Sequence, residues 1–177
     1  MNHYFYLKGE TQKLRTKSPL ILVKESGVHG KGIFAVKPIP KGTRIIEYVG
    51  EKVTKGEGTR REKLQEKQAR KGEGTIYVFE LDERWDIDGS VSWNTARYIN
   101  HSCEPNCEIF FENGGIWIAA LRDIDSGEEL SYDYGFDLDD FHKYPCKCGK
   151  KKCVGYMVAQ EHWKELKKLK ILHKPDA

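Results

Sequence analysis

Short apolar runs separated by glycines and charged residues make up most of the first two thirds of the chain. They are rich in Val, Ile, Phe and Tyr, which is typical of β-strands. The expected strands are LILVKE at 20–25, GIFAV at 32–36, TRIIEYVG at 43–50 and TIYVFEL at 75–81. The run CEIFFENGGIWIAAL at 107–121 predicts a hairpin, because Asn113, Gly114 and Gly115 tolerate positive φ between two apolar strands.

Two segments predict helices instead. Thr59 followed three residues later by Glu62 forms a capping box, and Gly72 is a suitable stop, so we expect a solvated helix over 60–71. The second helix is expected from about Gln160 to Leu172. Its apolar residues recur at helical spacing, which favours core packing over a partner site; they are Trp163, Leu166, Leu169 and Leu172. The fold class is therefore mainly β with short helices, not an alternating α/β sheet.

The size and composition indicate one globular domain. The chain has 177 residues, of which 38% are hydrophobic and 11% aromatic, enough to form a core of its own. No apolar run approaches the length that spans a bilayer, and the first residues do not resemble a secretory signal. We therefore expect an intracellular protein, where structural disulfides are rare.

The small net charge of +3 hides a segregation along the chain. Residues 82–140 carry 3 Lys and Arg against 15 Asp and Glu, whereas 1–81 carry 17 against 9 and 141–177 carry 10 against 3. Ordinary surface charge explains part of this. An acidic segment lining a cleft favours a cationic peptide, and basic flanks allow weak contact with nucleic acid.

All five cysteines lie at or beyond Cys103, and the last three are packed into eight residues. Zinc takes four tetrahedral ligands, so Cys146, Cys148 and Cys153 need a fourth, and the candidates are Cys103 and Cys107. Spacing alone leaves that choice open. The neighbouring lysines favour ionised thiolates. The alternative is a set of reduced cysteines in a basic tail, but the clustering favours zinc.

Four ordered blocks resemble the SET domain of protein-lysine methyltransferases, and a cysteine segment after them resembles its post-SET extension. The blocks are GVHGKGIFA at 27–35, EYVGE at 47–51, ARYINHSCEPN at 96–106 and GEELSYDYG at 127–135, followed by CKCGKKKC. The resemblance implies small curved sheets with a knot-like C-terminal threading. It implies a SET domain at 20–137 with a helical insert at about 57–72, a post-SET segment at 138–157 and a C-terminal amphipathic helix and tail at 158–177. No cysteine precedes 103 in this sequence, so we expect no cysteine-rich pre-SET module in it.

The activity that the resemblance implies is transfer of a methyl group from S-adenosylmethionine to a lysine amine. The implied cofactor-binding residues are His29, Gly30, Lys31, Tyr77, Arg97, Asn100 and His101. Gly30 lacks a side chain and lets the backbone approach the cofactor. Asn100 and His101 are expected to bind it through side chain and backbone, and Arg97 to orient the site.

The lysine is expected to enter through an aromatic channel, because aromatic walls exclude water and favour a cationic methyl centre. The matching positions are Tyr48, Phe79, Tyr132 and Tyr134. Tyr134 matches the essential hydroxyl and is expected to orient the amine rather than act as a base. A tyrosine at 132 crowds the channel, which predicts low methylation states.

The post-SET zinc of the family uses the cysteine of the NHSC run. The resemblance thus points to Cys103 with Cys146, Cys148 and Cys153, and leaves Cys107 as a small buried hydrophobe. The expected substrate is a basic peptide such as a histone tail, in the nucleus of a eukaryote, or in the cytoplasm or a host for a bacterial protein. The rival interpretation is a zinc-stapled module that binds nucleic acid or a peptide without catalysis.

Overall fold

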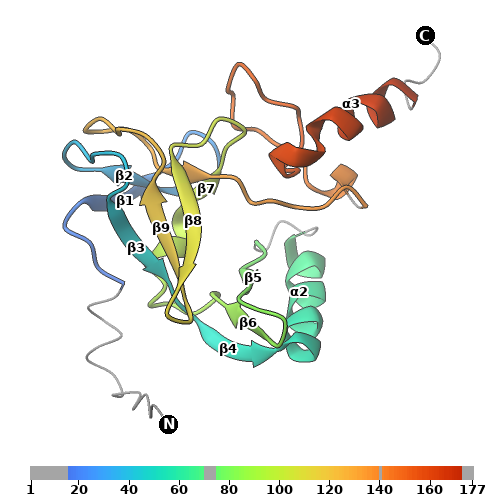
Figure 1. The fold of residues 1–177 in the computed structure, drawn as a ribbon, viewed down its shortest axis with the longest axis horizontal. Coiled ribbons are helices and arrows are strands. Elements are labelled where there is room, and N and C mark those ends of the chain that lie inside the picture. Colours follow the sequence, from blue (N-terminus) through green and yellow to red (C-terminus); the bar gives the residue numbers. More distant parts are fainter. Residues whose placement is uncertain (1–15, 70–74, 140, 173–177) are drawn as a thin grey trace.

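Four small sheets build the body of the molecule, which a computed structural model describes for residues 16–69, 75–139 and 141–172 (Figure 1). Strands β1 (Ile21–Glu25) and β2 (Lys31–Ala35) pair antiparallel. The central sheet has the order β3 (Arg44–Tyr48), β9 (Gly115–Ala120), β8 (Cys107–Glu112), and the third has the order β4 (Glu51–Thr54), β6 (Trp85–Asp88), β5 (Val78–Glu80). The fourth pairs β7 (Asn100–His101) with β10 (Ser131–Tyr132) in parallel. The mainly β fold class is confirmed, while the knot-like threading stays a prediction.

The predicted hairpin forms, with a shorter turn than expected. Asn113 and Gly114 have φ of 52° and 71°, and Glu112 pairs with Gly115 across the turn. Gly115 is thus the first residue of β9. A two-residue turn with both φ values positive matches the twist of the paired strands. The hairpin buries Ile116 and Ile118 completely and supplies the centre of the hydrophobic core.

Helix α2 (Lys55–Ala69) begins earlier than the capping box predicts. Thr59 lies inside the helix and donates its hydroxyl to the carbonyl of Lys55 at 2.9 Å. Thr54 occupies the cap position, because its Oγ1 accepts the amide of Glu57 at 3.4 Å. The prediction of the start was wrong, since a second hydroxyl-bearing residue stood one turn upstream. The helix is largely solvated as expected, and the predicted stop at Gly72 lies outside the described residues.

Strand β6 was not predicted, because its acidic residues face the interior and its apolar residues face outward, the reverse of the usual strand pattern. Asp86 and Asp88 are buried while Trp85 and Ile87 are half-exposed. Helix α2 packs on this strand and neutralises both carboxylates, with Lys55 on Asp86 and Arg61 on Asp88, each at 2.8 Å. The run 75–81 contributes only β5, and the run 43–50 ends at Tyr48 before β4 starts.

The C-terminal segment follows the sequence prediction more closely. Short 3₁₀ turns at Thr95–Tyr98, Phe141–Lys143 and Gln160–His162 connect the elements, and helix α3 runs from Trp163 to Leu172. Leu166 is completely buried, which confirms core packing for this stripe, while the side chain of Leu172 lies outside the described residues. Figure 1 shows α3 and the cysteine segment together at one end of the molecule, beside β7.

Candidate active site and metal centre

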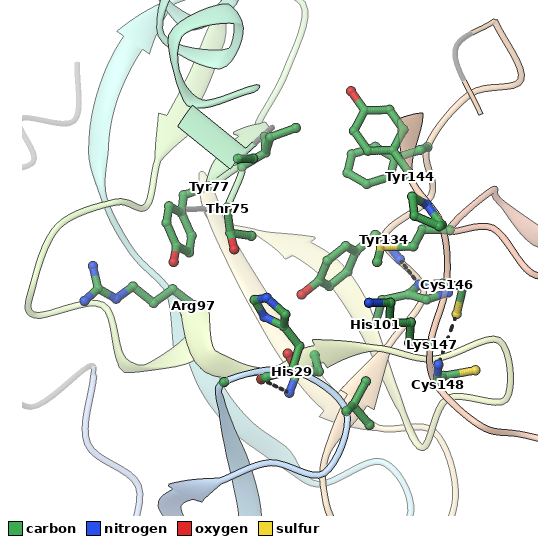
Figure 2. A pocket seen from close by; sticks show the side chains of 18 of the residues that line it. His29, Thr75, Tyr77, Arg97, His101, Tyr134, Tyr144, Cys146, Lys147 and Cys148 are labelled. Atoms are coloured by element: carbon green, nitrogen blue, oxygen red, sulfur yellow. Dashed lines mark hydrogen bonds between the residues drawn. The ribbon is translucent and has the colours of Figure 1, made fainter. Parts of the chain in front are cut away.

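A cavity of about 610 Å³ lies between the β-rich body and the cysteine segment (Figure 2). Tyr77 and Arg97 line it on one side, and Tyr144, Cys146 and Cys148 line it on the other. All seven residues predicted for the cofactor lie in its wall: His29, Gly30, Lys31, Tyr77, Arg97, Asn100 and His101. The structure thus brings together residues up to 72 positions apart in the sequence. They lie on β2, on the 3₁₀ turn Thr95–Tyr98, on β7, and in the segments just before β2 and β5.

A second, much smaller cavity of about 40 Å³ adjoins the first. Its wall contains all four predicted channel residues, namely Tyr48, Phe79, Tyr132 and Tyr134. Tyr77, Arg97 and Tyr134 line both cavities. The wide cavity and the narrow one therefore share a wall that includes Tyr134; the other shared residues are Thr75, Ile76, Tyr77, Arg97 and Phe136.

The aromatic rings of the narrow cavity form a continuous series. Ring centroids lie 5.1 Å apart for Tyr48 and Phe79, 6.2 Å for Phe79 and Tyr132, and 4.9 Å for Tyr132 and Tyr134. The Tyr48 hydroxyl donates to the carbonyl of Tyr77 at 2.8 Å. Burial raises the pKa of Tyr48, Tyr132 and Tyr134 well above the usual value of a phenol. These hydroxyls stay neutral at physiological pH and can orient a ligand without acting as phenolate bases.

Tyr134 is held by two hydrogen bonds to the segment 99–101. Its hydroxyl donates to the carbonyl of Ile99 at 3.0 Å, and its backbone amide donates to Nδ1 of His101 at 3.1 Å. His101 is 4% exposed, and burial lowers its pKa to about 4, so the imidazole is neutral. Its two ring nitrogens face Tyr134 and Cys103, which leaves the backbone of His101 for contact with a cofactor.

Asn100 is oriented by three acceptors on two segments. Its Nδ2 lies 3.1 Å from the carbonyl of Lys31, 3.4 Å from that of His29 and 2.9 Å from Oε1 of Glu129. Because Nδ2 faces these acceptors, the side-chain oxygen of Asn100 points away from them. Glu129 also accepts the hydroxyl of Ser26 at 2.7 Å. Sequence reasoning did not single out Glu129, although it lies in the block GEELSYDYG.

The guanidinium of Arg97 is committed to the chain itself. It donates to the carbonyl of Ser90 at 2.6 Å and to the Tyr98 hydroxyl at 2.8 Å, and it lies 5.6 Å from the ring centroid of Tyr77. These contacts fit the expectation that Arg97 orients the site. These contacts place the charge of Arg97 next to the rings of Tyr77 and Tyr98 in the cavity wall.

The far wall contains residues that the sequence prediction missed. The Tyr144 ring stacks on Phe136 at 4.3 Å, and its hydroxyl donates to Oε1 of Glu66 on α2. The helical insert and the cysteine segment thus touch each other across the cavity. Tyr144 stands two residues before Cys146, but no local pattern indicates that Glu66, 78 residues away, is its partner.

Four thiols gather behind this wall. The Sγ atoms of Cys103, Cys146, Cys148 and Cys153 all lie within 4.8 Å of one another. Cys103 Sγ is 3.8 Å from both Cys146 Sγ and Cys153 Sγ. Four thiolates bound tetrahedrally to zinc at about 2.3 Å have their sulfurs about 3.8 Å apart, so the thiol cluster fits this ion. Cys107 lies elsewhere, in the hydrophobic core.

Burial and hydrogen bonding act on the thiols of the cluster in opposite directions. Burial raises the pKa of Cys103 to about 12. Burial pushes the pKa of Cys148 upward as well, but hydrogen bonds from the backbone of Cys103 and Lys150 outweigh it and lower this pKa to about 7. Three lysines lie between Cys148 and Cys153, as the sequence prediction noted. A bound cation reverses the effect of burial, because it favours the thiolate form.

Comparison with known proteins identifies the family. A sequence profile described as the SET domain matches residues 30–135. The chain belongs to the SET-domain family. This SET domain is 41% identical over 155 residues to human "Histone-lysine N-methyltransferase 2D", which is 84% of this chain and 3% of that protein. It is 43% identical over 142 residues to "Histone-lysine N-methyltransferase trr" of Drosophila melanogaster, 77% of this chain and 6% of that protein.

A yeast relative extends the comparison. The SET domain is 39% identical over 149 residues to "Histone-lysine N-methyltransferase, H3 lysine-4 specific" of Saccharomyces cerevisiae, 81% of this chain and 13% of that protein. The chain therefore spans only a small part of the curated relatives it matches. Within the part of the SET-domain chain that the structure describes, no helix is long and apolar enough to cross a membrane.

Proposed function

We propose that this chain transfers methyl groups from S-adenosylmethionine to the side-chain amine of a lysine in a basic protein. One observation carries the proposal: a wide cavity and a narrow aromatic one share a wall that includes Tyr134. Such an arrangement admits two ligands from different sides and lets their reacting atoms approach in line. The names of the relatives, all histone-lysine methyltransferases, support the same reaction.

The wide cavity suits a ligand with an amino-acid end and an aromatic end. The side-chain oxygen of Asn100 is free of the acceptors that hold Nδ2, so it can accept a bond from an ammonium group. His29, Gly30 and Lys31 border the same end, and the stacked pair Phe136 and Tyr144 supplies a flat apolar surface at the cysteine segment. When bound, S-adenosylmethionine supplies an electrophilic methyl group.

The narrow cavity prepares the lysine. An ammonium has no lone pair, and free lysine has a pKa near ~10.4. Walls of Tyr48, Phe79 and Tyr132 exclude water and so lower the pKa of an entering amine. The Tyr134 hydroxyl, fixed by its bond to Ile99, orients that amine and stays protonated. Tyr132 restricts the space for added methyl groups, which favours low methylation states.

The thiol cluster suits a structural zinc ion. When bound, zinc ties the segment that carries Tyr144, Cys146 and Cys148 to Cys103 on the body of the fold. This segment forms one wall of the wide cavity, so the four cysteines shape the cofactor site without entering the reaction. We include Cys103 with Cys146, Cys148 and Cys153 in this site and exclude Cys107.

The substrate that fits the charge of the chain is a basic peptide, and a histone H3 tail is our first candidate. Residues 82–140 are strongly acidic, which speeds the approach of a cationic partner. Strand β5, which contains Phe79, is the outer strand of its sheet and can pair with an extended peptide. The name of the yeast relative points to lysine 4 of H3. Such a function belongs in the nucleus of a eukaryotic cell.

Two further parts of the proposal concern organisation and contacts. We divide the chain into a SET domain at 20–137 with its helical insert, a post-SET segment at 138–157, and a C-terminal helix and tail at 158–177. The lysines exposed in the post-SET segment and on α3 are suited to weak contact with the phosphates of nucleic acid near the histone.

Incubation with S-adenosylmethionine and peptides from the four core histone tails tests the proposal. We expect mass spectrometry to show methylation of one lysine, and Tyr134→Phe to lower kcat by about 10²–10³-fold, because a preorganised hydroxyl is lost. Tyr156→Phe is the matched control, since Tyr156 lines neither cavity. Binding of DNA or peptide without any methyl transfer contradicts the proposal and favours the non-catalytic module.

A further inference from the structure

The imidazole of His101 lies between the thiol cluster and Tyr134. Its Nδ1 is 3.1 Å from the backbone nitrogen of Tyr134, and its Nε2 is 3.6 Å from Sγ of Cys103. The ring is also in edge contact with the Tyr134 ring, with centroids 5.4 Å apart. One buried side chain therefore touches both a predicted metal ligand and the residue at the junction of the two cavities.

The two contacts determine the tautomer of the ring. A backbone amide can only donate, so Nδ1 of His101 must offer a lone pair to the amide of Tyr134. The single ring proton of a neutral imidazole then lies on Nε2, which faces the sulfur of Cys103. The ring thus joins the sulfur of Cys103 at one edge to the backbone of Tyr134 at the other. A displacement of that sulfur shifts the buried ring, and the ring carries the Tyr134 backbone with it.

A second connection runs between the same two parts of the chain. The carboxylate of Asp133 accepts the amide of Gln160 at 3.1 Å and that of Gly135 at 3.1 Å, and Gln160 Nε2 donates to the carbonyl of Cys103 at 3.3 Å. Asp133 Oδ1 also lies 3.7 Å from His101 Nδ1. The Asp133 side chain, next to Tyr134, is therefore linked through Gln160 to the backbone of Cys103.

We infer that His101 is a positioning residue that couples occupancy of the thiol cluster to the placement of Tyr134 at the mouth of the channel. The inference rests on the proposed function for its catalytic consequence only. It assigns to the imidazole a role distinct from the cofactor contact expected of the His101 backbone. The thiol cluster thus does more than support the cavity wall, since through His101 it also sets the position of the orienting hydroxyl of Tyr134.

The first test needs no substrate. Long-range ¹H–¹⁵N spectra of the full chain, with and without Zn²⁺, report the tautomer of His101. We expect protonated Nε2 and bare Nδ1 in the zinc-bound protein, with the Tyr134 amide resonance shifting when Zn²⁺ is added and that of Ile118 in β9 staying in place. A ring protonated at Nδ1, or a Tyr134 amide that does not respond to Zn²⁺, overturns the inference.

The second test uses two substitutions of different chemistry. His101→Phe removes both contacts, and we expect Zn²⁺ affinity, measured by competition with a chromophoric chelator, to fall about 10–100-fold. We expect kcat to fall by at least about tenfold, with little change in the KM for peptide. His101→Gln offers one acceptor and one donor, so it should recover about half or more of the lost affinity on a logarithmic scale. Cys107→Ala, a cysteine change outside the thiol cluster, should leave Zn²⁺ affinity within about twofold of the wild type.

The outcomes separate the two proposals. Unchanged Zn²⁺ affinity and kcat in His101→Phe overturn the coupling even if the protein methylates lysine. A protein that shows the expected tautomer and the Zn²⁺ response but transfers no methyl group refutes the proposed function and leaves the coupling intact. If His101→Phe does not fold, the spectra of the unaltered chain decide the matter.

Discussion

At the scale of single residues, the channel is defined by a few contacts that tolerate little change. Tyr132 is only 6% exposed, and its ring lies 6.2 Å from that of Phe79 and 4.9 Å from that of Tyr134. The space beside it is about 40 Å³, close to the volume of a single small group. One hydroxyl is therefore a large fraction of the room available to a methylated amine.

Tyr132→Phe is expected to raise the methylation state of the product, because it frees that room. Mass spectrometry of a peptide after equal numbers of turnovers measures the ratio of mono-, di- and trimethylated lysine. Tyr156→Phe removes a hydroxyl outside both cavities and should leave the ratio unchanged. Rapid trimethylation of the peptide lysine by the wild-type protein would contradict this prediction.

Gly89 supports the same wall from behind. A Cβ at this position would lie well inside van der Waals distance of the Tyr48 hydroxyl and the Asn94 amide. Asn94 is completely buried and donates to the carbonyl of Gly89 at 3.0 Å. Tyr48 is also buried and donates to the carbonyl of Tyr77, so neither side chain has room to move away from an added Cβ.

Gly89→Ala should therefore cost about 1–3 kcal/mol of unfolding free energy and break the bond between Tyr48 and Tyr77. Chemical denaturation measures the first effect and the rate of methyl transfer the second. Gly56→Ala in α2 is the matched control, because nothing lies within 4 Å of the added Cβ, and it should be neutral or slightly stabilising. Equal stability of the two variants would show that the Gly89 contact is not rigid.

At the scale of elements, α2 is held to the sheet by charge rather than by apolar packing. Arg61 donates to Asp88 at 2.8 Å and to Glu51 at 2.6 Å, and the Asp88 side chain is 5% exposed. Gln65 on the next turn accepts the amide of Tyr77 at 2.7 Å. The helical insert thus positions a residue that lines both cavities.

Arg61→Ala leaves the Asp88 carboxylate buried without its main partner, which should cost about 2–3 kcal/mol. Arg60→Ala is the control. Arg60 is 62% exposed and pairs with Glu57, so its loss should cost less than about 0.5 kcal/mol. Chemical denaturation of both variants in the same buffer measures the two losses of unfolding free energy. Similar losses would contradict the view that Arg61 is the main partner of the buried Asp88 carboxylate.

The same pair predicts a pH dependence of stability. Burial alone would raise the pKa of Asp88, but hydrogen bonds from Arg61 and Ser90 lower it below its usual value. A depressed folded pKa contributes stability at pH values above ~3.9, and this contribution disappears as the pH falls through the folded value. Arg61→Ala removes the strongest of the hydrogen bonds that lower this pKa, so we expect the pKa of Asp88 to be higher in the variant than in the wild type. The difference in unfolding free energy between Arg61→Ala and the wild type should therefore become smaller as the pH falls. A difference that grows in acid would contradict this prediction.

At the scale of the whole molecule, two parts far apart in the sequence enclose one cavity. The body contributes His29, Tyr77 and Asn100, and the cysteine segment contributes Tyr144 and Cys148. Among the described residues 141–172 no strand is assigned. This part is joined to the body by the thiol cluster and by bonds such as Tyr144 to Glu66 and Gln160 to Asp133. Its order should depend on the metal.

Removal of zinc by a chelator is expected to accelerate amide hydrogen exchange in 141–169 while β3, β8 and β9 stay protected. Affinity for S-adenosylmethionine should fall by about tenfold or more, because one wall of its cavity loosens. Added Zn²⁺ should restore both, and Mg²⁺ should not, because it prefers oxygen ligands. Uniform exchange across the chain after chelation would contradict this picture.

Much of the site could be predicted from local patterns. The hairpin turn at Asn113 and Gly114, the stripe around Leu166 and the crowding of Cys146, Cys148 and Cys153 are visible within a few residues. The predicted cofactor and channel residues all line one of the two cavities, and their roles stay predictions. The start of α2 was misplaced, because Thr54 and Thr59 are each followed three residues later by a glutamate, so the local pattern does not distinguish the two caps.

The sequence by itself determined the mainly β fold class, the order of the family blocks and the presence of a thiol cluster. Only the tertiary structure decided that β6 buries its aspartates, that Glu129 orients Asn100 and that Tyr144 meets Glu66. It also decided that His101 joins Cys103 to Tyr134. The physical reason is the distance along the sequence over which each signal acts. Propensity and periodicity act over one or two turns, whereas each of these contacts pairs a polar group with a partner from another element of the folded chain.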